Sequence, residues 1–260
     1  MLTNPLRLAH EPSDSNKPLC CVPIVATDRA EALAQAARIR AHTPSPDLVE
    51  LRADYLTTMR PAEIATLLSE LCAVLGRDLP LLFTYRRADE GGAGHADEAT
   101  RLASITAAVT SRQVAFIDIE LATTPEDRTR VMALAQAEGI GVVVSIHDFS
   151  GTPNDATLRD QFMRLIASGA TVAKLVVTAK IPRDALRLLE MTSSVAATAT
   201  IPLIALAMGP AGTLTRLAGP FFGSALTFAT IGPSSAPGQM PIALVRDYWA
   251  AAGLRTHDAR

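Results

Sequence analysis

Short apolar runs alternate with longer mixed stretches along this chain of 260 residues, and the pair repeats eight times. The runs are rich in Val, Ile, Leu and Ala, a pattern that is typical of parallel strands buried on both faces. The predicted strands cover residues 19–26, 47–51, 79–84, 114–121, 140–146, 171–177, 201–207 and 225–229.

The stretches between the runs carry signals for helix starts. Asp28 and Asn154 suit N-cap positions, and Pro61, Pro125 and Pro182 suit first turns. The predicted helices begin near residues 28, 61, 96, 124, 154, 182, 214 and 240; the third ends near 111 and the last near 252.

Eight strand–helix units in about 235 residues match a (β/α)8 barrel in number and in size. The alternative is an open doubly wound sheet, which usually has a glycine-rich turn after its first strand, and Ala26-Thr27-Asp28 has none. We therefore expect the α/β class and a (β/α)8 TIM barrel, single domain, at 18–260. Residues 1–17 do not fit the repeat, and we expect a polar N-terminal tail or a barrel plug there.

Charge and composition exclude several classes of partner. With 24 basic and 26 acidic residues, the net charge of −2 gives no general attraction for nucleic acid or an anionic membrane. Every apolar run is shorter than the ~18 residues of a membrane span. Cys20, Cys21 and Cys72 form no CxxC motif, which fits a reducing compartment. We expect a cytoplasmic protein with no nucleic-acid partner and no membrane contact.

Polar side chains gather where successive predicted strands end. In a (β/α)8 barrel the chemistry takes place at the carboxyl ends of the strands. Polar residues close or follow the second to the sixth strand: Glu50, Arg52, Arg86, Asp118, Glu120, Ser145, His147, Asp148 and Lys174. Five successive strands that end in this way predict a polar cavity.

Lys174 stands in an otherwise uncharged run, Ala170-Thr171-Val172-Ala173-Lys174-Leu175-Val176-Val177. Burial disfavours an ammonium, and a buried lysine often serves as a neutral amine that attacks a carbonyl. The alternative is a lysine whose amine reaches solvent from the strand end. His147 is likewise either an acid–base catalyst or a hydrogen-bonded core histidine.

The carboxylates at the strand ends allow structural and catalytic interpretations. Glu50 and Arg52 can form a salt bridge or bind a ligand, and for Asp118 and Glu120 we favour a structural role that holds basic neighbours. Carboxylates with His147 can also bind a metal, but no HxH or HExxH spacing supports this.

Two late segments point to anion binding. Residues 208–216 run from a strand end into a helix start, where backbone N–H groups and Arg216 can converge on a carboxylate. Residues 234–239 are small and polar, as in a loop that closes over a ligand or in an ordinary turn.

In their order and spacing these motifs resemble the type I 3-dehydroquinate dehydratase family. The motifs are Glu50-Leu51-Arg52-x-Asp54, Phe83-Thr84-Tyr85-Arg86 with Glu90-Gly91-Gly92, Asp118-x-Glu120, Ser145-Ile146-His147-Asp148-Phe149, Lys174, Met208-Gly209-x-x-Gly212-x-x-x-Arg216 and Ser235-Ala236-Pro237-Gly238-Gln239. The resemblance implies a homodimeric barrel enzyme of the shikimate pathway that uses no metal and no cofactor. Its small-molecule substrate would be 3-dehydroquinate, which loses water to give 3-dehydroshikimate.

The resemblance also implies roles for individual residues. Lys174 would form the Schiff base, His147 would be the general acid and base, and Glu90 would be the acidic residue beside the histidine. The implied substrate-binding positions are Glu50, Arg52, Arg86, Arg216, Ser235, Gln239, Met208 and Phe228. Pro23 stands where some members have a serine that touches the substrate, so that contact differs here.

Other functions remain open at this stage. A Schiff-base aldolase would also combine a barrel lysine with an imine, but it would cleave a carbon–carbon bond. A binding-only paralogue would hold a polyhydroxy acid without converting it. A metal-dependent hydrolase would lose its activity to a chelator.

Overall fold

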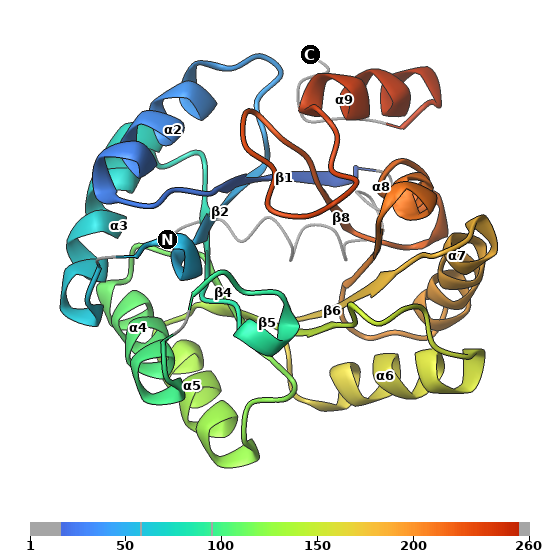
Figure 1. Cartoon of the computed structure of the whole chain (residues 1–260), viewed down its shortest axis with the longest axis horizontal. Helices are drawn as coiled ribbons and strands as arrows, with labels where there is room; N and C mark the ends of the chain where they lie inside the picture. Colours follow the sequence, from blue (N-terminus) through green and yellow to red (C-terminus); the bar gives the residue numbers. More distant parts are fainter. Residues whose placement is uncertain (1–16, 58, 95, 255–260) are drawn as a thin grey trace.

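A computed structural model describes residues 17–57, 59–94 and 96–254, in which eight parallel strands form a nearly closed barrel surrounded by helices (Figure 1). The prediction of a (β/α)8 barrel in a single domain is confirmed. The tail or plug predicted at 1–17 lies, except for Lys17, outside the described residues. The strands are β1 (Leu19–Ile24), β2 (Leu48–Arg52), β3 (Leu81–Thr84), β4 (Phe116–Glu120), β5 (Gly141–His147), β6 (Val172–Thr178), β7 (Leu203–Met208) and β8 (Leu226–Phe228).

All neighbouring strands of the sheet run parallel, in the order β7-β6-β5-β4-β3-β2-β1-β8. The last gap, between β7 and β8, is bridged by an isolated parallel pair of Leu203 and Ser224 and by a hydrogen bond of 2.7 Å from the Ala225 N–H to the Leu203 carbonyl. This bridge closes the ring next to the short strand β8.

The helices start where the sequence places their signals. The side chain of Asp28 accepts the Glu31 N–H, that of Asn154 accepts the Thr157 N–H, and Pro182 opens a helix. The helices are α2 (Arg29–Ala41), α3 (Pro61–Leu75), α4 (Glu98–Ser111), α5 (Pro125–Ala137), α6 (Asp155–Ala167), α7 (Pro182–Ala196), α8 (Thr213–Ala218) and α9 (Ile242–Ala251), with 3-10 turns η1 (Ala53–Tyr55), η2 (Ala88–Glu90), η3 (Pro210–Gly212) and η4 (Gly219–Phe222). Within the described residues, no helix combines the length and the apolar character that a bilayer crossing needs.

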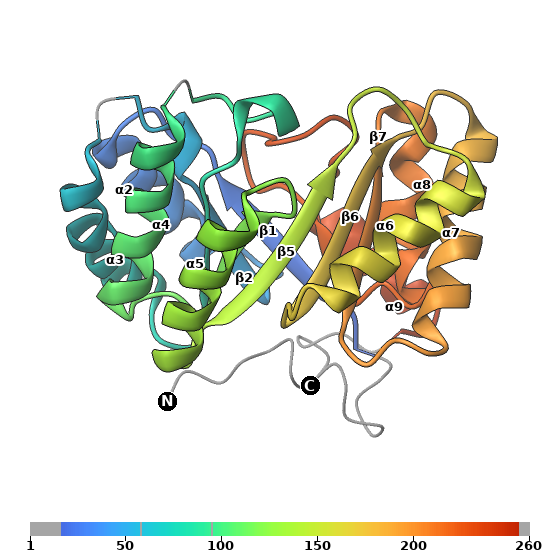
Figure 2. The ribbon, with the colours of Figure 1, turned by 90° about the horizontal axis from the view of Figure 1, so that it is seen from below.

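Alternation along each strand divides the apolar residues into two layers. On β6, Ala173, Leu175 and Val177 belong to the large cluster between strands and helices, whereas Val172 and Val176 belong to the cluster inside the barrel. Lys174 has the same parity as Val172 and Val176, so it points inward. The strands all point toward one face of the barrel (Figure 2). Near that face the interior positions hold buried polar side chains such as Lys174 and Glu50.

Candidate active site

The predicted polar cavity opens at the carboxyl ends of the strands. The site residues implied by the family resemblance all line it: Lys174, His147, Glu90, Glu50, Arg52, Arg86, Arg216, Ser235, Gln239, Met208 and Phe228. Asp118, Glu120 and Ser145, which were also expected in the polar cavity, are fully buried and do not line it. Asp148 does not line it; its carboxylate accepts the backbone N–H groups of Ser150 and Gly151 in a turn.

Lys174 is only 4% exposed, and its amine has a carboxylate partner. Its Nζ donates to Asp118 Oδ2 at 2.8 Å and lies 4.7 Å from the centre of the Phe228 ring. The amine therefore neither reaches bulk solvent nor lies among apolar groups alone. The alternative of a lysine whose amine reaches solvent from the strand end is therefore wrong. The uncharged run around Lys174 did not reveal the counter-charge, because Asp118 comes from another strand.

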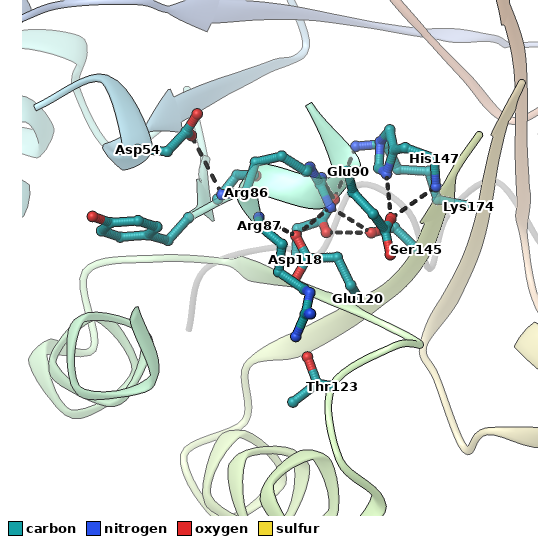
Figure 3. Close-up of polar contacts among 12 residues, drawn as sticks. Asp54, Arg86, Arg87, Glu90, Asp118, Glu120, Thr123, Ser145, His147 and Lys174 are labelled. Carbon is teal, nitrogen blue, oxygen red and sulfur yellow. Dashed lines mark hydrogen bonds and ion pairs between the residues drawn. The ribbon is translucent and has the colours of Figure 1, made fainter. Parts of the chain in front are cut away.

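Asp118 is the centre of a buried network (Figure 3). Its carboxylate also pairs with Arg86 Nη2 at 2.7 Å and accepts the Ser145 hydroxyl at 2.6 Å. Burial by itself would raise the pKa of Asp118, but Arg86 and Lys174 outweigh burial and hold the pKa well below its usual range. Asp118 therefore remains a carboxylate, and the structural role expected for it, holding basic neighbours, is confirmed.

Glu120 extends this network to the barrel's outer helices. It accepts from Arg86 Nη1 and from Arg101 Nη1, each at 2.7 Å, and from the Arg87 N–H at 3.0 Å. Arg86 thus lines the cavity, but its guanidinium donates its hydrogen bonds to Glu120, Asp118 and Ser145. Sequence reasoning missed Arg101, which lies in the middle of α4, away from any strand end.

His147 and Glu90 form the second polar pair of the cavity. Glu90 Oε2 accepts the His147 backbone N–H at 2.8 Å and lies 3.2 Å from Nδ1 of the ring (Figure 3). Burial, with the positive charges of Arg86 and Lys174, lowers the pKa of His147 well below its usual value. Burial raises the pKa of Glu90 to about 7, against the opposing effect of Arg86. The ring is therefore neutral at neutral pH, and an ionised Glu90 favours the ring proton on Nδ1 and a free lone pair on Nε2.

Glu50 and Arg52 do not form the salt bridge considered from the sequence. Arg52 makes two bonds of 2.8 Å to Asp54, and Glu50 accepts the Thr84 hydroxyl at 2.8 Å. Both side chains still line the cavity, with Glu50 facing it without an arginine partner among the described residues.

Arg216 brings a buried positive charge to the cavity. It is 2% exposed, its Nη2 donates to the Pro237 carbonyl at 3.1 Å, and its Nε has no hydrogen-bond partner in the described part of the chain. Within the described residues no carboxylate pairs with it, and burial lowers its pKa to about 10. A buried guanidinium with an unused donor is well suited to a ligand carboxylate.

The connection from β8 to α9 covers one side of the cavity. Gln239 Oε1 accepts the Ser235 N–H, and Gln239 Nε2 donates to the Ser235 hydroxyl, both at 3.0 Å. Arg52 Nη1 reaches the Ser235 carbonyl at 3.5 Å. Residues 234–239 therefore lie over the site, as expected of a loop that covers a ligand.

Apolar side chains complete the lining. Sequence reasoning did not assign a role to five further residues that line the cavity: Gly91, Phe149, Val176, Leu206 and Ala236. The inward parity of Val176 on β6 was the available signal for that residue. Pro23 lies opposite Glu50 in the β1–β2 register but does not line the cavity. Within the described ranges, no group of three or more His, Cys, Asp and Glu side chains is placed to hold a metal ion.

Comparison with known proteins places this site in a family. A family model described as type I 3-dehydroquinase matches residues 20–255. The 3-dehydroquinate dehydratase of Albidiferax ferrireducens is 38% identical over 228 residues, which cover 86% of this chain and 85% of that protein. That of Shouchella clausii is 35% identical over 231 residues, which cover 88% of this chain and 90% of that protein.

Solved structures agree with the sequence matches. The 3-dehydroquinate dehydratase of Geobacillus kaustophilus HTA426 has a TM-score of 0.87 and 36% identity, covering 94% of this chain and 93% of that one. The type I enzyme of Clostridium difficile, in a crystal structure with covalent modified comenic acid, has a TM-score of 0.86 and 29% identity. The match covers 92% of this chain and 93% of that one. This chain belongs to the type I 3-dehydroquinase family.

Proposed function

We propose that this chain is a 3-dehydroquinate dehydratase, a hydro-lyase of the shikimate pathway that supplies aromatic amino acid biosynthesis. It converts 3-dehydroquinate to 3-dehydroshikimate through a Schiff base on Lys174. One observation carries the proposal: a buried amine, a neutral imidazole with a carboxylate partner and an arginine without a carboxylate partner among the described residues line the same cavity. Membership of the family, with relatives of this name at 34–38% identity over most of the chain, supports it.

The ion pair between Lys174 and Asp118 suits an imine mechanism. To attack the substrate ketone, Lys174 Nζ must give up a proton, and the neutral His147 ring in the same cavity can take it. Protonated His147 then returns this proton to the carbinolamine hydroxyl, which leaves as water. The product is a protonated imine with the same single positive charge as the original ammonium, and His147 is again neutral. Asp118 therefore stabilises the iminium with no rearrangement, which is preorganised electrostatic catalysis.

His147 can also carry the proton transfers at carbon and oxygen. With the ring proton held on Nδ1 by Glu90, the Nε2 lone pair can remove a proton from the carbon next to the imine. The electron pair moves into the iminium and forms an enamine. When the enamine expels the hydroxyl group, protonated His147 returns the proton to it as water. Hydrolysis of the remaining imine frees Lys174.

Arg216 fixes the orientation of the substrate. Its unused Nε donor and its positive charge match the carboxylate of 3-dehydroquinate. A ring anchored at the carboxylate presents one C–H bond to the base. Glu50, Arg52, Ser235 and Gln239 would bind the ring hydroxyls, Met208 and Phe228 would pack against the ring, and Arg86 would balance charge.

The experiment combines turnover with chemical trapping. Incubation with 3-dehydroquinate is expected to raise the conjugated-enone absorbance, and borohydride is expected to fix an adduct that peptide mass mapping places on Lys174. No absorbance rise at micromolar enzyme would refute the dehydratase. An adduct with carbon–carbon cleavage would indicate an aldolase, and a raised melting temperature without an adduct would indicate a binding-only protein. Full activity with a chelator is expected, because the iminium itself is the electron sink.

Assembly and location form part of the same proposal. We expect a cytoplasmic homodimer, as the family resemblance implies, with Cys20, Cys21 and Cys72 reduced; all three are free thiols in the structure. Sedimentation equilibrium checks the dimer, and a monomer at micromolar concentration would contradict it. Residues 18–260 would form the catalytic domain, and deletion of residues 1–17 tests whether the tail contributes to stability or turnover.

A further inference from the structure

Asp54 is a buried carboxylate to which neither the motif pattern nor the mechanism assigns a task. It lies in η1 directly after β2, is 2% exposed and does not line the cavity. Burial would raise the pKa of Asp54, but the hydrogen bonds and the positive charge of Arg52, with the Ala93 N–H, outweigh burial and lower this pKa. A charged group in such a place is retained only where its hydrogen bonds are satisfied.

The hydrogen bonds of Asp54 hold both ends of the segment that carries Glu90. Its Oδ1 accepts the Arg86 N–H at 3.3 Å, where the segment leaves β3 (Figure 3). Its Oδ2 accepts the Ala93 N–H at 3.0 Å, three residues beyond Glu90. The chain is also packed closely here, since a Cβ on Gly94 would lie 2.8 Å from the Asp54 carbonyl oxygen.

The same carboxylate orients a second element of the site. It binds Arg52 through Nε and Nη2, so the remaining nitrogen, Nη1, is directed to the Ser235 carbonyl. Figure 1 shows η2 and the β8–α9 connection both lying over the ring of strands. Asp54 is therefore the one described carboxylate that touches both the Glu90 segment and the arginine facing the β8–α9 connection.

We propose that Asp54 is a positioning residue, which fixes the Glu90 segment so that Glu90 stays in contact with His147 and which aims Arg52 at the loop over the site. The inference rests on the proposed function. It predicts that Asp54 acts on proton transfer through Glu90 and on substrate binding through Arg52.

A double-mutant cycle tests the route through Glu90. Asp54→Asn keeps the shape of the side chain but turns one acceptor into a donor, and it should lower kcat about 10- to 100-fold, the effect of displacing a catalytic group by about 1 Å. In a Glu90→Gln background the same change should lower kcat less than about threefold, because coupled residues are not additive. Equal losses in both backgrounds would overturn the proposal.

The matched control is Asp89→Asn. Asp89 also makes two bonds to an arginine two residues away, from Arg87 Nε and Nη2 at 2.9 Å, but the Asp89 side chain is 62% exposed and lies outside the cavity. It should leave kcat within about twofold, as an exposed pair contributes little.

A measurement without substrate separates failure of this inference from failure of the proposed function. In the unaltered protein, the ¹⁵N shift of His147 Nδ1 should follow the ionisation of Glu90 near pH 7. In Asp54→Asn that inflection should move to lower pH by at least one unit. A Glu90 side chain that is no longer held in place becomes solvated, and its pKa falls because burial no longer raises it. Gly94→Ala leaves the Asp54 carboxylate intact but pushes the Glu90 segment away from Asp54, so it should shift the inflection in the same direction. This variant replaces Asp54→Asn if Asp54→Asn does not fold. An unmoved inflection in folded protein would overturn the proposal, whether or not the protein converts 3-dehydroquinate.

Discussion

The amine of Lys174 and the carboxylate of Asp118 are in direct contact, with 2.8 Å between Nζ and Oδ2 inside the barrel. The two residues are 56 positions apart in the chain and stand on β6 and β4. Asp118 also binds Arg86, so one carboxylate faces two buried cations. This arrangement means that the negative charge of Asp118 matters both for the stability of the barrel and for the imine on Lys174.

Asp118→Asn should destabilise the protein by about 3–5 kcal/mol at pH 7, since it leaves Arg86 and Lys174 short of a counter-charge. The folded-state pKa of Asp118 is lowered, so its contribution is present above the ordinary carboxyl pKa and is lost as the pH falls. Urea unfolding should therefore show that the difference in free energy of unfolding between Asp118→Asn and the unaltered protein becomes smaller below about pH 4. The exposed Asp160, 3.8 Å from Arg164, is the control, and Asp160→Asn should change nothing measurable.

Lys174→Ala and His147→Ala should separate imine formation from elimination. Without Lys174, borohydride should trap no adduct, whereas Lys180→Ala, which removes an exposed lysine just after β6, should trap as much as the unaltered protein. His147→Ala should still be trapped but should lose about 10²- to 10⁴-fold in kcat, the usual contribution of a general acid–base group. Normal turnover by His147→Ala would show that another group is the base.

The pH dependence of kcat/KM should report Glu90. Its pKa of about 7 lies above the lowered pKa of His147, so activity should fall as the pH drops through about 7, where Glu90 gains a proton and no longer holds Nδ1–H. Glu90→Gln should lower kcat and move this limb to a lower pH. An unchanged limb near pH 7 in Glu90→Gln would assign the ionisation to another group.

The same ionisation should be visible in stability. An acid whose pKa is raised on folding destabilises the folded state progressively as the pH rises from the unfolded pKa to the folded pKa, and it has no such effect below both values. Between the ordinary value of 4.5 and about 7 this amounts to about 3 kcal/mol at about 1.4 kcal/mol per pH unit. Glu90→Gln should therefore exceed the unaltered protein in stability by up to about 3 kcal/mol at pH 8 and match it at pH 4, as measured by urea unfolding at both pH values.

Arg216→Gln should raise the melting temperature of the free protein and weaken substrate binding. Burial lowers the pKa of Arg216, so its charge opposes folding at neutral pH until a ligand carboxylate arrives. Losing that charge-assisted bond should raise KM about 10- to 100-fold. Calorimetry without and with substrate checks both effects, and a lower melting temperature in the free variant would contradict this account.

The sequence by itself determined the repeat of strands and helices and the end of the barrel at which the polar residues gather. These features depend on local signals: apolar runs, N-caps at Asp28 and Asn154, and prolines at first turns. The family motifs added the site residues, and all of them line one cavity.

The tertiary structure alone decided which charges pair. It gave Lys174 the carboxylate of Asp118, gave Arg52 the carboxylate of Asp54 instead of Glu50, and left Arg216 without one among the described residues. Pairing depends on the register between strands and on the rotamer of each long side chain, and hydrophobic periodicity specifies neither. The charge of the site was therefore settled only when strands distant in sequence closed into a ring.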